Sequence, residues 1–74
     1  MEYRGHVKWF NHYRGWGFVT GNDGQDYFVH QRDVLSGGWK VLREGEAVIF
    51  ELAEKGSRVS AVNVRRVAKE VMWF

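Results

Sequence analysis

The chain alternates apolar and polar side chains over short segments, with glycine, asparagine and aspartate between them. A two-residue period is typical of strands, because successive side chains point to opposite faces of a sheet. Residues 1–66 contain no apolar repeat of helical period that would support a helix of about ten residues. The pattern predicts five strands, over about Gly5–Asn11, Trp16–Thr20, Asp26–Gln31, Ala47–Ala53 and Val59–Val67.

The segments between these strands carry turn residues. Gly21–Gly24 reads Gly-Asn-Asp-Gly and predicts a hairpin turn, because these residue types tolerate positive φ. Arg43–Glu46 and Glu54–Ser57 predict further turns on either side of the fourth strand. Gln31–Leu35 could form a single helical turn, and Ser36–Gly38 opens a loop that carries Trp39.

Five short strands without a long crossover, in 74 residues, predict one all-β domain. The expected architecture is a five-stranded antiparallel barrel of the OB-fold type, since closure removes exposed strand edges. On the fifth strand, Val59, Ala61, Asn63 and Arg65 are expected on one face. The expected core contains Val7, Tyr27, Val19, Val29, Val48, Phe50, Val59 and Ala61.

Both faces of the second and third predicted strands are apolar or aromatic. Trp16 and Phe18 share one face of their strand, and Phe28 and His30 share one face of the next. The opposite faces hold Gly17, Val19, Tyr27 and Val29. A barrel of this size cannot contain both sets, since interiors are already close-packed. We therefore predict that Trp16, Phe18 and Phe28 are exposed.

The residue types needed for catalysis or metal binding do not occur in suitable patterns. The chain has no cysteine, and His6, His12 and His30 lie on separate segments without metal-ligand spacing. No serine lies in a nucleophile elbow, and the glycines around Trp16 are not followed by the Gly-Lys-Ser/Thr of a phosphate loop. The sequence predicts a protein that is not an enzyme and uses no metal or cofactor.

Charge and aromatic content together favour nucleic-acid binding. The net charge is only +2, whereas 16% of the residues are aromatic. Exposed rings stack on bases of any sequence. Lys8 and Arg14 lie beside these rings, although a single basic side chain is more often merely solvated. His30 could stack on a base and donate a hydrogen bond. The simpler interpretation is that it is a surface histidine without contact to a ligand. Lys40, Lys55 and Arg58 lie in loops that could flank a groove.

No apolar run reaches the roughly 18 residues of a membrane span. The first residues, Met1–Arg4, also lack the apolar stretch of a signal peptide. These features predict a cytoplasmic protein that has no membrane partner.

Several segments, in the right order, resemble the cold-shock domain family over about residues 3–67. Val7–Asn11 is similar to the family's first strand, Arg14–Val19 to its first ribonucleoprotein motif and Tyr27–Gln31 to its second. Several motifs at matching spacing make this resemblance specific. Further matches are Gly38–Lys40, Leu42–Glu46 and Ala61–Val64.

The resemblance implies a five-stranded OB-fold barrel that binds single-stranded RNA or DNA with little sequence preference, often favouring pyrimidines. Members commonly act as nucleic-acid chaperones without ATP, and some influence transcription or translation. Carried over by position, the stacking residues would be Trp9, Trp16, Phe18, Phe28, His30 and Trp39, with a partial contribution from Phe10. The polar contacts would be Lys8, Asn11, Arg14 and Asp23.

The chain departs from the family pattern at four places. Trp16 replaces the usual Phe or Tyr, which enlarges the ring. Gln31 stands where many bacterial members have another aromatic residue and where eukaryotic Y-box relatives often have glutamine. This stacking site would therefore become a hydrogen-bonding one. Gly56–Arg58 replaces the Gly-Pro that commonly precedes the fifth strand. Residues 68–74 form a tail outside the pattern, which leaves residues 1–67 as the expected domain.

Two other functions fit parts of the sequence. A small barrel with an aromatic groove could dock a peptide instead of a nucleic acid. An RNA-recognition fold shares the first motif, but it requires two helices that this sequence cannot supply. A monomer is expected; the tail could pack on the barrel, mediate a dimer or be disordered, and the sequence leaves these alternatives open.

Overall fold

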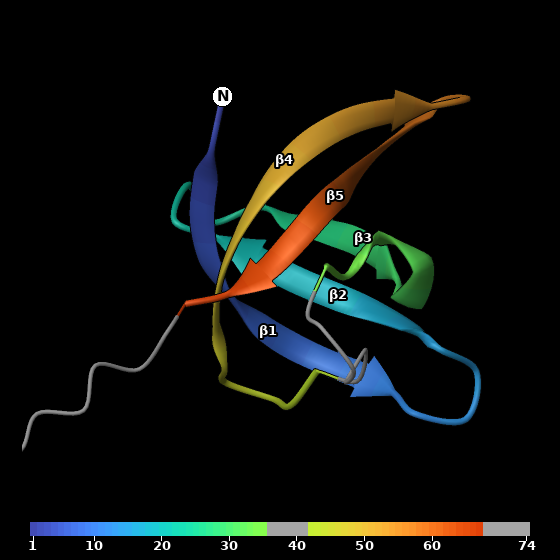
Figure 1. The fold of residues 1–74 in the computed structure, drawn as a ribbon. Helices are drawn as coiled ribbons and strands as arrows, with labels where there is room; N and C mark the ends of the chain where they lie inside the picture. Colours follow the sequence, from blue (N-terminus) through green and yellow to red (C-terminus); the bar gives the residue numbers. More distant parts are fainter. Residues whose placement is uncertain (36–41, 68–74) are drawn as a thin grey trace, which may run out of the picture.

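Five strands and one turn of 3-10 helix make up the part of the chain that the computed structural model describes, residues 1–35 and 42–67 (Figure 1). Each predicted strand is present, and Gln31 begins the helical turn instead of ending the third strand. The loop that carries Trp39 and the tail 68–74 lie outside the described residues. The elements are β1 (Tyr3–Asn11), β2 (Trp16–Gly21), β3 (Asp26–His30), η1 (Gln31–Asp33), β4 (Ala47–Lys55) and β5 (Arg58–Arg66).

The strands close into a barrel in the order β1-β2-β3-β5-β4, with β4 pairing back onto β1. The OB-type barrel is confirmed, but the prediction that every pair is antiparallel is wrong, because β3 pairs with β5 in parallel at Phe28 and Ser60. The reason is the odd number of strands. Directions can alternate around a closed ring only when the number of strands is even, so five strands leave one parallel pair.

Small apolar residues fill the barrel. Two buried residues lie outside the strands and were not predicted: Val34 follows η1, and Leu42 precedes the turn before β4. Tyr27 is only partly buried and packs against the core, where its ring lies 5.9 Å from that of Phe50. The buried apolar set is Val7, Val19, Val29, Val34, Leu42, Val48, Phe50, Ala61 and Val64.

The predicted face of β5 is wrong, because the strand does not alternate regularly. Val59 is 40% exposed, whereas Ala61 and Val64 are both buried. Asn63 lies between them with φ of 51°, and the register between β4 and β5 shifts in this region. One extra residue in a strand reverses the faces beyond it. The bulge therefore points Val64 into the core and leaves Asn63, whose Nδ2 donates to Glu51 Oε1 at 2.7 Å, outside.

β1 and β2 approach each other closely at two glycines. A Cβ on Gly5 would overlap the backbone of Thr20, and one on Gly17 would overlap the carbonyl oxygen of Trp9. Gly17 lies between Trp16 and Phe18, so this contact sets how closely the aromatic strand β2 lies against β1. The absence of a side chain at Gly17 therefore allows the aromatic rings of β1 and β2 to come together.

Candidate nucleic-acid interface

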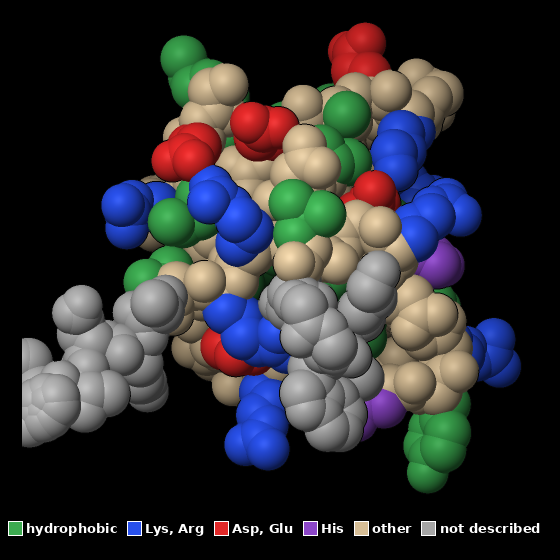
Figure 2. Space-filling model, in the orientation of Figure 1, with side chains coloured by type: hydrophobic (Ala, Val, Ile, Leu, Met, Phe, Trp, Pro, Cys, Tyr) green, Lys and Arg blue, Asp and Glu red, His purple; other side chains and the backbone are tan. Residues whose placement is uncertain are grey.

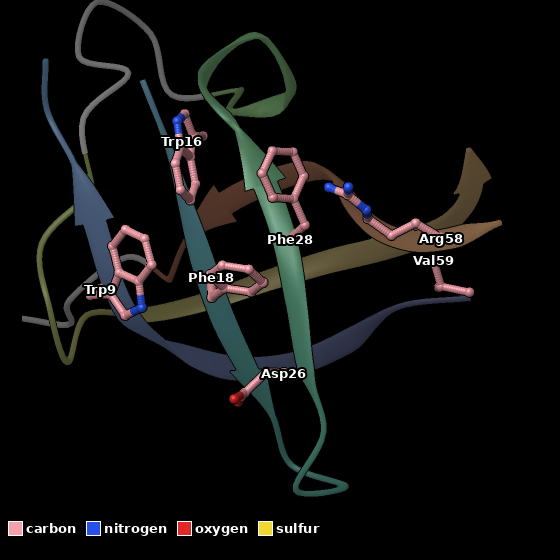
Figure 3. Close-up of a pocket in the computed structure, with 7 residues that line it drawn as sticks. All are labelled: Trp9, Trp16, Phe18, Asp26, Phe28, Arg58 and Val59. Carbon is pink, nitrogen blue, oxygen red and sulfur yellow. The ribbon is translucent and has the colours of Figure 1, made fainter. Parts of the chain in front are cut away.

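Four aromatic rings gather on one side of the barrel (Figure 3). They come from three adjacent strands: β1 supplies one ring, β2 two and β3 one. We call Trp9, Trp16, Phe18 and Phe28 the aromatic cluster. All four side chains are half-buried, so the rings of β2 and β3 lie at the surface and outside the core, although they are less exposed than predicted. The cluster lines a cleft of about 610 Å³ together with Asp26, Arg58 and Val59.

Strand register explains why these rings meet. Phe18 pairs with Phe28 on one side and with Trp9 on the other, so the three side chains form a row across β1, β2 and β3. Trp16 pairs with His30 one step further along the same face. The alternate residues of β2 and β3 point inward, and Val19 and Val29 are fully buried there.

The rings of the aromatic cluster support one another mainly by edge and tilted contacts. Trp9 lies 5.2 Å from Trp16 at 63° and 5.5 Å from Phe18 at 51°, measured between ring centroids. Phe18 meets Phe28 at 5.9 Å and 80°. Such geometries are the favoured ones for aromatic pairs. All four rings line the cleft, where a planar ligand could reach them.

The cleft includes Arg58, which the sequence analysis placed in a loop that could flank a groove. The guanidinium carbon of Arg58 lies 4.7 Å from the centroid of the Phe28 ring. Arg58 begins β5 directly after the turn at Gly56, which has φ of 67°, and Val59 follows it along the rim. Its contact with Phe28 could not be predicted, because the contact joins strands far apart in sequence.

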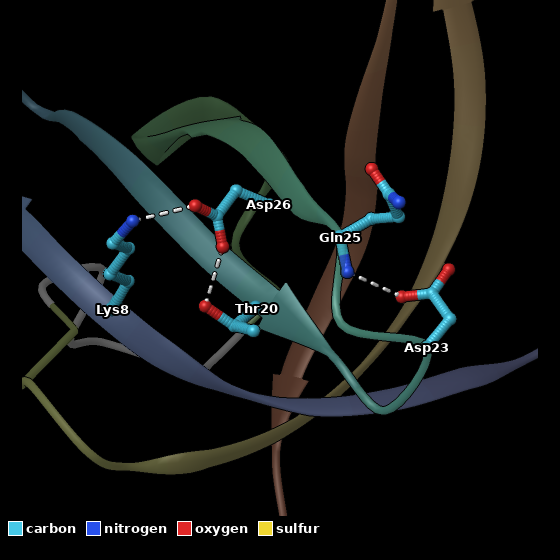
Figure 4. Close-up of polar contacts among 5 residues, drawn as sticks. All are labelled: Lys8, Thr20, Asp23, Gln25 and Asp26. Atoms are coloured by element: carbon cyan, nitrogen blue, oxygen red, sulfur yellow. Dashed lines mark hydrogen bonds and ion pairs between the residues drawn. The ribbon is translucent and has the colours of Figure 1, made fainter.

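Lys8, a predicted phosphate contact, forms an ion pair at the edge of the cleft (Figure 4). Its Nζ donates to Asp26 Oδ2 at 2.6 Å, and the Thr20 hydroxyl donates to Asp26 Oδ1 at 2.7 Å. The bond from Lys8, and then that from Thr20, holds the pKa of the Asp26 carboxyl below its usual range. Asp26 was not predicted as a site residue. Its carboxylate holds Lys8 beside the cluster.

Asp23, another predicted polar contact, lies apart from the aromatic cluster. Its Oδ1 accepts from the backbone N–H of Gln25 at 3.0 Å (Figure 4), and its Oδ2 accepts from the Tyr27 hydroxyl at 2.7 Å. Tyr27 belongs to the inward face of β3, next to Phe50. The bond from Tyr27 is the main reason that the pKa of Asp23 is lowered. The structure therefore gives Asp23 a role in the turn and does not bring it to the rings.

The bond between Asp23 and Tyr27 predicts a stability difference at high pH. The Asp23 carboxylate accepts this hydrogen bond from the Tyr27 hydroxyl, and the bond raises the pKa of Tyr27 from 10.0 to about 12. Because the pKa of Tyr27 is higher in the folded chain than in the unfolded chain, the hydrogen bond stabilises the fold fully below pH 10.0. This stabilisation is lost as pH rises through about 12. The native protein should be more stable than Tyr27→Phe below that window, and the difference should shrink across it. Urea unfolding of both proteins at a series of pH values measures this, and a difference independent of pH would contradict it.

Three predicted contacts, Asn11, Arg14 and Gln31, meet at the turn between β1 and β2, at the Trp16 end of the cluster. Asn11 Oδ1 accepts from the backbone N–H of Tyr13 at 3.0 Å and of Arg14 at 2.9 Å. Gly15 continues the turn with φ of 76°, and its carbonyl accepts from the N–H of Gln31 at 2.7 Å. The exposed side chain of Gln31 lies against Gly15. Asn11 therefore shapes the turn, while Arg14 and Gln31 present polar groups beside it.

The other predicted stacking residues differ in position. His30 lies across from Trp16, and its Nδ1 accepts from the backbone N–H of Arg32 at 3.2 Å, which caps η1. This bond leaves Nε2 of His30 as the nitrogen available to a ligand. Phe10 packs against the core, and its nearest ring partner outside the core is His12 at 6.3 Å. Trp39 lies outside the described residues.

On the face of the molecule in Figure 2, charges of both signs are interspersed. Figure 2 shows basic side chains across the face in view, with acidic side chains among them. Within residues 1–35 and 42–67, no group of three or more His, Cys, Asp or Glu could hold a metal ion. No helix in these residues is long and apolar enough to cross a membrane. The ion pairs are Lys8–Asp26, Lys55–Asp33, Arg65–Glu2 and Arg66–Glu46.

Similar proteins carry the same domain. The chain is 48% identical over 62 residues to the cold shock-like protein CspE of Buchnera aphidicola, an alignment that covers 82% of this chain and 90% of that protein. It is 40% identical over 65 residues to the major cold shock protein of Streptococcus pyogenes, covering 88% and 97%. It is 48% identical over 61 residues to the cold shock-like protein CspG of Shewanella violacea, covering 81% and 87%.

The fold and the family model agree with these similarities. The structure superposes on a solved chain, Drosophila Unr CSD456, with a TM-score of 0.78 at 19% identity, and the match covers 99% of this chain and 29% of that one. The family model of the 'Cold-shock' DNA-binding domain matches residues 3–67. Members of this family bind nucleic acid and are not enzymes, as the residue types predicted. The chain therefore belongs to the cold-shock domain family.

Proposed function

We propose that this protein binds single-stranded RNA or DNA by stacking unpaired bases on the aromatic cluster. The observation that carries the proposal is the row of partly exposed rings across β1, β2 and β3, which lines an open cleft. Stacking is worth about 1–3 kcal/mol per base and does not depend on base identity. Three or four bases bound in this way would give micromolar affinity or tighter without a strongly basic surface.

The binding residues include polar groups around the cluster. Lys8 would leave Asp26 for a backbone phosphate at little cost, because an exposed ion pair contributes only about 0–1 kcal/mol. Asp23 would act through the turn between β2 and β3. The remaining proposed contacts lie at the Trp16 end of the cluster or beyond the described residues: Phe10, Asn11, Arg14, His30, Gln31 and Trp39.

The cellular activity that follows is that of a nucleic-acid chaperone in the cytoplasm. A protein that binds only the unpaired strand shifts a hairpin toward its open form by mass action, and this requires no ATP. An effect on transcription or translation would follow from opening such hairpins. The proposed unit is residues 1–67 acting as a monomer.

Tryptophan fluorescence during titration tests this function. Trp9 and Trp16 belong to the cluster, so heptathymidine should quench the emission strongly, while a duplex of the same length should not. The affinity should fall with log[salt] with a slope of about −0.7 for each phosphate neutralised, and two or three contacts give a modest slope. Absence of binding to any single strand, or equal binding to duplex, would contradict the proposal, and the first result would favour peptide docking.

A further inference from the structure

The Phe28 ring is already occupied on the side that faces β5. Trp16 lies 5.8 Å away with its plane tilted by 31°, and the guanidinium carbon of Arg58 lies 4.7 Å from the ring centroid. Figure 3 shows the ring between these two side chains, and the strand order agrees, because β3 lies between β2 and β5. A base that stacks on Phe28 from the cleft therefore meets Arg58.

Arg58 is held at this place by the hairpin that carries it. β4 ends at Lys55 and β5 begins at Arg58, so the two residues face each other across the Gly56–Ser57 turn. Lys55 Nζ forms an ion pair with Asp33 Oδ2 at 3.0 Å, which ties the hairpin to η1. Opposed residues of an antiparallel pair project to the same face. The ion pair thus positions the hairpin beside β3, where Arg58 reaches Phe28.

The charge of Arg58 is not neutralised by a neighbouring carboxylate. Within the described ranges 1–35 and 42–67, Lys8 and Lys55 have carboxylate partners, whereas no carboxylate forms an ion pair with Arg58. The guanidinium is exposed and lies over a ring face. It is therefore a cation within the cleft that a ligand can engage without first breaking an ion pair.

The space between Arg58 and Phe28 is too small for a base. A flat group inserted between two others needs roughly 7 Å, twice the contact distance between carbon atoms. The guanidinium is 4.7 Å from the ring, so it must move outward as a base enters. Because guanidinium groups stack on bases as well as on aromatic rings, the displaced group can lie on the outer face of the same base.

We propose that Arg58 is a nucleotide-binding residue that completes a sandwich of Phe28, a base and the guanidinium. This inference rests on the proposed function and adds a residue to its site. The Arg58–Phe28 contact of the free protein is exchanged for two contacts to the base, so the cation favours binding although it first covers the ring. The residue also gives the altered turn before β5 a direct role in binding.

Substitution of Arg58 tests the sandwich by fluorescence titration with heptathymidine. Arg58→Ala should weaken binding about two- to fivefold, the range expected for a cation–π contact at an exposed site. Arg58→Lys should recover little of this loss, because an ammonium has charge but no planar face. Arg65→Ala is the matched control: it removes one exposed positive charge from the same strand, away from the cleft, and should leave the affinity unchanged.

A double substitution identifies the partner of Arg58. In a Phe28→Ala background, Arg58→Ala should cause little further loss, because the sandwich has already lost its other face. Independent, additive losses would overturn the proposal. So would full recovery by Arg58→Lys together with a salt slope reduced by about 0.7 in Arg58→Ala, which indicates a phosphate contact. Tighter binding by Arg58→Ala would show that the residue only covers Phe28.

These outcomes are separate from a failure of the proposed function. If the native protein did not bind heptathymidine, the function itself would be wrong. If the native protein bound it and Arg58→Ala bound equally well, only the sandwich would be wrong. Circular dichroism of each variant establishes that the barrel is folded, and exposure of Arg58 makes a loss of folding unexpected.

Discussion

Replacing Phe18 with alanine should weaken binding of heptathymidine about tenfold or more, which is the stacking contribution of one base. Phe18 lies in the middle of the row of rings across β1, β2 and β3, where it contacts Trp9 at 5.5 Å and Phe28 at 5.9 Å. Its removal takes away one stacking surface and also leaves the neighbouring rings without support. Phe28→Ala should have an effect of the same order. Fluorescence or calorimetric titration measures both.

The matched control is Tyr13→Ala. Tyr13 is 99% exposed in the turn between β1 and β2 and does not line the cleft. Its loss removes an exposed ring of similar size, so affinity should remain unchanged. Unfolding curves should show that all three variants retain the barrel, since Phe18 and Phe28 are only partly buried. Normal binding of heptathymidine by both Phe18→Ala and Phe28→Ala would show that the cluster is not the stacking surface.

The second large effect concerns stability. Gly17→Ala should lower the free energy of unfolding by about 3 kcal/mol, the upper part of the range for overpacking a filled interior. The added Cβ would overlap the Trp9 carbonyl oxygen and lie 2.7 Å from the Phe10 Cα. Both obstacles are backbone atoms, so relief requires β1 and β2 to separate. A domain of this size has only about 5 kcal/mol to lose, so about 2 kcal/mol would remain and a few per cent of the molecules would be unfolded.

Gly24→Ala separates this clash from the general cost of replacing glycine. Gly24 has φ of 84° in the turn between β2 and β3, and a Cβ there would meet no atom within 4 Å. Its substitution should cost about 1 kcal/mol through backbone strain alone. Urea unfolding of both variants gives the comparison. If Gly17→Ala cost no more than Gly24→Ala, the close approach of β1 and β2 would not limit the fold.

The strands and the aromatic surface could be predicted because their signals are local. β2 alternates regularly, so Trp16 and Phe18 had to share a face. The register of β1 against β2, in contrast, shifts between Val7 and Trp9. The volume available inside a small barrel then decided which set of side chains was exposed. The elements that could not be predicted depend on pairing between distant segments. The bulge at Asn63 reverses the faces of β5, and nothing in the adjacent residues marks it as a bulge.

The candidate site shows the same division. The rings of β2 and β3 were predicted from spacing, and strand register places Trp9 beside them. Asp26 was missed, and Arg58 was predicted only as a basic residue that could flank a groove. Each acquires its role from a partner on another strand: Lys8 on β1 for the first and Phe28 on β3 for the second. Asp23 was expected at the surface that binds the ligand, but its carboxylate is engaged by Tyr27.

The parallel pairing of β3 with β5 has a consequence for how the molecule forms and opens. β1, β2 and β3 follow one another through short turns, so most of the aromatic surface can assemble from local contacts. The seam between Phe28 and Ser60 joins distant parts of the chain and carries a larger loop-closure cost. A strand of nucleic acid that touches both Phe28 and Arg58 bridges this seam. Bound nucleic acid would therefore slow the separation of β3 from β5 and with it the opening of the barrel.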